Sequence, residues 1–74
     1  MLIRGTTRVA GVFGWPVRHS LSPIFQNAAF RATGIDCVYV PMEVHPGCIA
    51  TAVSAIRALG LYGVNCTIPH KEAV

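Results

Sequence analysis

The chain has 74 residues, of which 53% are hydrophobic and 12% charged, with a formal net charge of +3. An ordinary soluble domain has about 25% charged residues and a chain this short has a marginal core, so the composition predicts part of a larger protein that covers its apolar surface. A membrane-spanning helix is excluded as the reason, because the most apolar window, residues 49–64, falls short of about 20 residues and contains Arg57 and Gly60.

The first predicted elements are a strand and a helix. Residues 8–13 (RVAGVF) form an apolar, β-rich run that ends at Gly14, which predicts a strand followed by a turn. Ser22 is the predicted N-cap of the helix and Pro23 its first residue, because proline lacks the N–H that would be unpaired there. Apolar residues at helical spacing then lead to Gly34, the predicted C-terminal cap.

The second half of the chain repeats this order. Residues 37–44 (CVYVPMEV) are strand-like, with Pro41 indicating an edge position. Residues 49–60 have helical spacing, residues 63–68 form a third short strand, and Pro69 starts another helix. Strands that alternate with helices predict an α/β fold with a mostly parallel sheet.

A first polar cluster lies where the first helix begins, in the stretch HSLSPIFQN. If the segment is extended, Ser20 and Ser22 share a face and Leu21 points into the core. Unpaired N–H groups and the positive end of the helix dipole would then suit a carboxylate or a hydroxyl-rich ligand. The alternative is that Ser22 caps the helix and Ser20 makes a local turn bond, and on these residues alone the alternative is favoured.

A second polar cluster, NCTIPHK, follows the third strand. Asn65 and Thr67 alternate with Cys66 and share a face at the carboxyl end of the strand, where parallel α/β sheets bind ligands. Lys71 lies in the first turn of the next predicted helix, where the dipole disfavours a cation. A residue placed against a local rule indicates a functional site, although a solvated surface lysine explains Lys71 equally well.

Several other kinds of site are disfavoured by the sequence. Cys37, Cys48 and Cys66 are odd in number and have no CxxC spacing, which argues against a disulfide framework or a zinc site and predicts a cytoplasmic protein. Arg4 and Arg8 interrupt any signal peptide. The basic residues are scattered without interleaved aromatics, so no nucleic-acid partner is expected. The absence of G-x-G-x-x-G predicts no dinucleotide site in this chain.

The two clusters in this order, GWPVRHSLSP (residues 14–23) and GVNCTIPHK (residues 63–71), resemble the N-terminal, substrate-binding domain of shikimate dehydrogenases. The resemblance covers nearly the whole chain with the family's usual spacing. It implies a two-domain α/β dehydrogenase that reduces 3-dehydroshikimate to shikimate with NADP as cofactor, in the route to chorismate and the aromatic amino acids. Residues 1–74 would be part of the first domain, with the NADP-binding domain absent, and the resemblance allows a homodimer of the full-length protein.

The resemblance also implies roles for five residues. Ser20 and Ser22 would hold the substrate carboxylate, and Asn65 and Thr67 would bind ring hydroxyls or the carboxylate. Lys71 would be the catalytic lysine, which stabilises or exchanges the proton on the oxygen at C3. The family's catalytic aspartate has no match in this chain, so we expect residues 1–74 alone to be inactive.

Two other functions remain open on the sequence. A quinate or dual quinate/shikimate dehydrogenase is the nearest, although two serines rather than a serine and a threonine lean toward shikimate. The other is a small module that binds a hydroxylated carboxylate without chemistry, which requires a chain that ends at Val74 and still folds.

Overall fold

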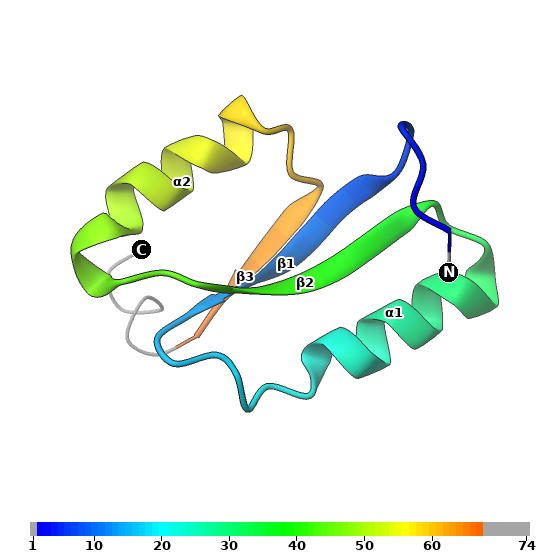
Figure 1. The fold of residues 1–74 in the computed structure, drawn as a ribbon, viewed down its shortest axis with the longest axis horizontal. Helices are drawn as coiled ribbons and strands as arrows, with labels where there is room; N and C mark the ends of the chain where they lie inside the picture. Colours follow the sequence, from blue (N-terminus) through cyan, green and yellow to red (C-terminus); the bar gives the residue numbers. More distant parts are fainter. Residues whose placement is uncertain (1, 68–74) are drawn as a thin grey trace.

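A computed structural model describes residues 2–67 and places strands and helices in alternation (Figure 1). The α/β class predicted from the sequence is confirmed. Within the described residues, no helix combines the length and the apolar character needed to cross a bilayer. The elements are β1 (Arg8–Gly14), α1 (Ser22–Thr33), β2 (Cys37–Glu43), a short 3₁₀ turn (Pro46–Cys48), α2 (Ile49–Ala58) and β3 (Gly63–Cys66).

The three strands form one parallel sheet in the order β2-β1-β3. The crossover from β1 to β2 carries α1, and the crossover from β2 to β3 carries α2, so the two helices lie on opposite sides of the sheet (Figure 1). Pro41 is on β2, at the edge of the described sheet, as its missing N–H predicts. The helix predicted to begin at Pro69 lies outside the described residues.

The core lies between the sheet and α1. Ala10 and Val12 of β1 and Cys37 and Tyr39 of β2 are all buried, because alternate side chains of a strand point to the same face. Phe30 of α1 packs against this face. Burial of apolar area at about 25 cal/mol per Å² makes this layer the main stabilising contact of the described residues.

The end of α1 has the predicted cap. Gly34 has a φ of 71°, in the left-handed region that favours glycine. Its N–H donates to the carbonyls of Arg31 and Phe30. The helix therefore ends where the sequence predicts, and the chain turns back toward β2.

Candidate functional site

Polar side chains gather at the edge of the sheet where the parallel strands end. Residues 15–21 leave the end of β1 and lead into α1, and β3 ends beside β1 at the same edge (Figure 1). Ser20 lies in the first segment and Ser22 is the first residue of α1, whereas Asn65 and Thr67 lie at the end of β3. The structure thus brings these four predicted site residues to one edge. Lys71 lies outside the described residues.

The start of α1 differs from the sequence prediction. Leu21 is the N-cap, with a nearly helical φ and ψ of −92° and −6°, so the prediction that Ser22 caps the helix is wrong. The prediction that Leu21 points into the core is also wrong, because Leu21 is 60% exposed. The physical reason is a turn in the preceding segment: the N–H of Ser20 donates to the carbonyl of Val17 at 3.0 Å, so the segment is not extended.

The N–H groups at the start of α1 already have partners. Those of Ile24 and Phe25 both donate to the carbonyl of Leu21, at 3.1 and 3.3 Å, and that of Ser22 donates to Ser20 Oγ at 3.2 Å. The N–H groups of Ser22, Ile24 and Phe25 are therefore not free for a ligand, and the local turn bond of Ser20 is confirmed. Within residues 2–67 the Ser22 hydroxyl has no hydrogen-bond partner, so a ligand at this helix start meets hydroxyl groups.

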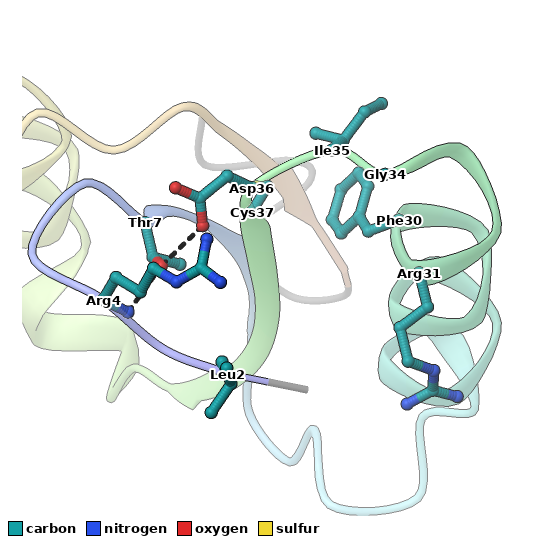
Figure 2. Close-up of a pocket in the computed structure, with 9 residues that line it drawn as sticks. All are labelled: Leu2, Arg4, Thr7, Phe30, Arg31, Gly34, Ile35, Asp36 and Cys37. Carbon is teal, nitrogen blue, oxygen red and sulfur yellow. Dashed lines mark hydrogen bonds between the residues drawn. The ribbon is translucent and has the colours of Figure 1, made fainter.

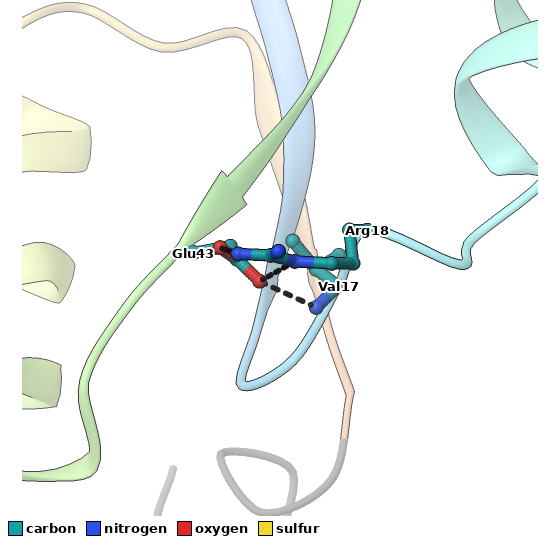
Figure 3. A network of polar contacts seen from close by, with 3 residues as sticks. All are labelled: Val17, Arg18 and Glu43. Carbon is teal, nitrogen blue, oxygen red and sulfur yellow. Dashed lines mark hydrogen bonds and ion pairs between the residues drawn. The ribbon is translucent and has the colours of Figure 1, made fainter.

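Glu43, the last residue of β2, binds the segment that contains Ser20 and Ser22, which we call the serine segment (residues 15–22). Its Oε1 accepts a hydrogen bond from Arg18 Nη2 at 2.8 Å, and its Oε2 accepts from Arg18 Nε and from the N–H of Val17, both at 3.3 Å (Figure 3). We call these three residues the Glu43 clamp. Because the carbonyl of Val17 accepts from the N–H of Ser20, the clamp fixes the chain from which the two serines project.

The clamp also determines the local electrostatics. The hydrogen bond from Arg18, and after it the N–H of Val17, lowers the pKa of Glu43 below its ordinary value. The same bond raises the pKa of Arg18. Both groups are therefore charged at neutral pH, and Arg18 compensates the negative charge of Glu43.

Thr67 joins the end of β3 to β1. Its N–H and its Oγ1 both donate to the carbonyl of Phe13, at 2.9 and 3.2 Å. Gly14 makes this approach possible, because a Cβ at that position would collide with Thr67 Oγ1 and lie only 3.0 Å from Val17 Cβ. The end of β3 and the serine segment therefore meet over Gly14.

Asn65 of β3 forms a hydrogen bond with Tyr39, a buried residue of β2, and β1 lies between these two strands. Its Nδ2 donates to the hydroxyl oxygen of Tyr39 at 3.0 Å, and Tyr39 is only 4% exposed. Within residues 2–67 the Oδ1 of Asn65 has no partner. The amide thus presents an acceptor at the same edge as the serines.

Sequence reasoning misses the residues that support these four side chains. Gly14, Arg18, Tyr39 and Glu43 were not predicted to belong to the site. The sequence contains one signal for Glu43, which is a charged residue at the end of an apolar strand, three residues before Pro46. In the fold it lies opposite the turn after β1, which is rich in polar residues. The partners lie 25 or 26 residues apart in the sequence, so no local pattern links them.

These residues do not fit a metal or a dinucleotide. Within residues 2–67, no group of three His, Cys, Asp or Glu side chains is placed to hold a metal ion. A glycine-rich turn after β1 would be needed to cradle a pyrophosphate, but residues 15–21 and the carboxylate of Glu43 occupy that place.

A shallow cavity of about 270 Å³ lies at the opposite edge of the sheet, where β2 begins (Figure 2). Asp36, which lines it, binds two neighbouring threonines. The hydroxyls of Thr6 and Thr7 each donate to the carboxylate of Asp36 at 2.6 Å, and the backbone N–H of Arg4 donates to Thr7 Oγ1 at 2.8 Å. The two threonine bonds lower the pKa of Asp36. Because the hydroxyls of Thr6 and Thr7 already bind Asp36, this edge is the weaker candidate for a site.

Comparison with known proteins identifies the family of this chain. Residues 12–74 match the family model described as the shikimate dehydrogenase substrate binding domain. The chain is 57% identical over 74 residues to the shikimate dehydrogenase (NADP(+)) of Geobacter metallireducens, covering 100% of this chain and 26% of that protein. It therefore spans about a quarter of the length of the curated relatives it matches.

Solved structures have the same fold. The crystal structure of the shikimate dehydrogenase from Aquifex aeolicus is 43% identical, with a TM-score of 0.94 over 97% of this chain and 27% of its own. That of the Listeria monocytogenes shikimate 5-dehydrogenase in complex with shikimate and NAD is 40% identical, with a TM-score of 0.86 over 90% of this chain and 23% of its own. The chain therefore belongs to the shikimate dehydrogenase substrate binding domain family.

Proposed function

We propose that this chain is the substrate-binding part of an NADP-dependent shikimate dehydrogenase, which reduces 3-dehydroshikimate to shikimate on the way to chorismate and the aromatic amino acids. The observation that carries the proposal is the meeting of two serines with Asn65 and Thr67 at one edge of the sheet. The names of the relatives support the activity and the cofactor, and the Listeria monocytogenes complex supports shikimate as the substrate.

The serine segment supplies donors for the substrate carboxylate. The hydroxyl of Ser22 has no partner within residues 2–67, and Ser20 Oγ accepts from the N–H of Ser22 while keeping its own proton to donate. Both lie at the positive end of the α1 dipole, which favours an anion. We assign the carboxylate to these two hydroxyls.

The end of β3 supplies acceptors for the ring hydroxyls. Asn65 Nδ2 is held by Tyr39, which leaves Oδ1 to accept. Thr67 Oγ1 donates its proton to the carbonyl of Phe13, so its remaining lone pairs also accept. Donors at the serines and acceptors at the end of β3 match a ring that carries a carboxylate on one side and hydroxyls on the other.

Lys71 is the proposed catalytic residue, on the family resemblance of the stretch that contains it. Its ammonium group would stabilise negative charge on the oxygen at C3 and exchange a proton with it. NADP, when bound, supplies hydride. Because residues 2–67 do not fit a dinucleotide, we assign NADP to the part of the enzyme outside this chain.

The binding roles are tested in the full-length enzyme with Ser20→Ala and Ser22→Ala. Each variant should raise the KM for shikimate about tenfold, the effect of losing one hydrogen bond to a charged group, without changing the KM for NADP⁺. Ser54→Ala, an exposed serine of α2, is the matched control and should change neither constant. With the neutral carboxamide of shikimate, the penalty of the two site variants should become smaller, because a bond to a neutral acceptor contributes less than one to a charged group.

Other outcomes separate the rival functions. An unchanged KM in both serine variants would mean that the hydroxyls serve only the turn. Lys71→Ala should reduce kcat by orders of magnitude and change the KM much less, whereas lost binding with preserved turnover would overturn its catalytic role. Faster turnover of quinate than of shikimate would assign quinate as the substrate.

A further inference from the structure

Tyr39 links the proposed site to the interior of the molecule. It lies in the middle of β2, is 4% exposed, and belongs to the core face that packs against α1. Its hydroxyl nevertheless reaches past β1 and accepts a hydrogen bond from Asn65 Nδ2 at 3.0 Å. A buried tyrosine hydroxyl requires a polar partner, and here the partner is a residue of the proposed substrate site.

The backbone of Tyr39 is itself held from α1. Asn27 Nδ2 donates to the carbonyl of Tyr39 at 2.8 Å, and Asn27 Oδ1 accepts from the N–H of Tyr39 at 2.8 Å. One side-chain amide thus binds both polar backbone groups of one residue. Because Asn27 and Ser22 belong to the same helix, α1 fixes both the serine end of the site and the origin of the Tyr39 side chain.

In the structure, the contact with Tyr39 leaves the oxygen end of the Asn65 amide free. The terminal torsion of asparagine is broad and roughly two-fold, so a free Asn65 would present its oxygen and its nitrogen about equally. With Nδ2 held by a hydroxyl whose ring is packed in the core, Oδ1 is the atom left over. This orientation selects a ligand that donates a hydrogen bond, such as a ring hydroxyl.

We propose that Tyr39 is a positioning residue for substrate recognition: supported by Asn27, it orients the amide of Asn65 so that Oδ1 accepts from a hydroxyl of the substrate. The inference rests on the proposed function, because that function makes Asn65 a substrate-binding residue. It goes beyond that function in one respect: the Tyr39 hydroxyl affects substrate binding only through Asn65.

The test is a double-mutant cycle in the full-length enzyme with Tyr39→Phe, Asn65→Ala and the double variant. Tyr39→Phe keeps the ring and removes one oxygen, so it should raise the KM for shikimate about three- to tenfold and leave the KM for NADP⁺ unchanged. Asn65→Ala should raise the KM for shikimate at least as much. In the Asn65→Ala background, Tyr39→Phe should add nothing, because residues that act as one unit are not additive.

Tyr62→Phe is the matched control, because Tyr62 is 59% exposed and lies at the opposite end of β3. It should leave both KM values unchanged. Thermal unfolding of each variant separates a loss of stability from a loss of recognition.

The two proposals fail in different ways. Additive effects in the double variant, or an unchanged KM in Tyr39→Phe beside a raised one in Asn65→Ala, would overturn the positioning role and leave the substrate site intact. An unchanged KM in Asn65→Ala would overturn the assignment of Asn65 and the positioning role with it.

Discussion

The two ends of β2 each carry a carboxylate that holds a segment flanking β1. Asp36 immediately precedes the strand and binds the hydroxyls of Thr6 and Thr7, which lead into β1. Glu43 ends the strand and binds Arg18 and the N–H of Val17, which follow β1. Both ends of the same strand pair are therefore fastened by similar chemistry, and the pKa of both carboxyls is lowered.

The ends differ in what they leave unpaired. At the start of β2 the threonine hydroxyls both donate to Asp36, beside a cavity that Arg4 and Arg31 also line. At the end of β2, Glu43 binds a guanidinium and a backbone N–H, and the Ser22 hydroxyl and Asn65 Oδ1 have no partner within residues 2–67. The end of β2 that carries Glu43 therefore presents free hydroxyl and amide groups beside a held segment, which makes it the stronger candidate for a binding site.

The largest effect is expected from adding a methyl group where the end of β3 meets the serine segment. In Gly14→Ala the new Cβ displaces Thr67 and crowds Val17, so we expect a loss of about 1–3 kcal/mol in the free energy of unfolding and a raised KM for shikimate. Denaturant unfolding and steady-state kinetics of the full-length enzyme measure both. Gly63→Ala is the control, because its Cβ would meet nothing within 4 Å. Equal effects of the two substitutions would contradict the close packing over Gly14.

An intermediate effect is expected from neutralising the two carboxylates in turn. Glu43→Gln weakens the bond to Arg18 and loosens the serine segment, so the KM for shikimate should rise, though less than in Gly14→Ala. Asp36→Asn should leave that KM unchanged and lower the Tm slightly, because its partners lie at the other edge. A rise in KM in Asp36→Asn as large as that in Glu43→Gln would erase the distinction between the two ends.

The smallest effect is expected from pH. The pKa of each carboxyl is lowered by folding, from ordinary values of 4.5 for Glu43 and 3.8 for Asp36, so each stabilises the fold fully above that value and loses its contribution as pH falls through the lowered one. The Tm difference between the wild type and Glu43→Gln should therefore shrink below about pH 4.5, and that for Asp36→Asn should shrink only at lower pH. Differences that grow on acidification would have the wrong sign for carboxylates stabilised by their partners.

The elements and their order could be predicted because their signals are local. Gly34 ends α1 in a left-handed conformation, and Pro41 lies on an edge strand, each for a reason contained in its own residue type. The cap of α1 could not be predicted in this way. Ser22 has the higher propensity for that position, but the bond between Ser20 and Val17 bends the chain earlier and makes Leu21 the first residue with a nearly helical backbone.

The supporting residues of the site depend on the sheet order, which no local signal gives. Tyr39 meets Asn65 because β2 and β3 flank β1, and Glu43 meets Arg18 because β2 ends level with the turn that follows β1. The residues predicted from motifs are those we propose to face the ligand. The residues that hold them are visible only after the strands are placed side by side.

The bond between Asn27 and Tyr39 also bears on whether the edge of the sheet can pair with another molecule. The carbonyl of Asp36 and the N–H of Val44 both bond to β1, so the odd positions between them turn their backbone groups outward, to the open edge of the described sheet. At Tyr39 those groups are occupied by Asn27, and at Pro41 there is no N–H to offer. An open strand edge is a template for intermolecular β-pairing and aggregation, and here two successive outward positions are blocked.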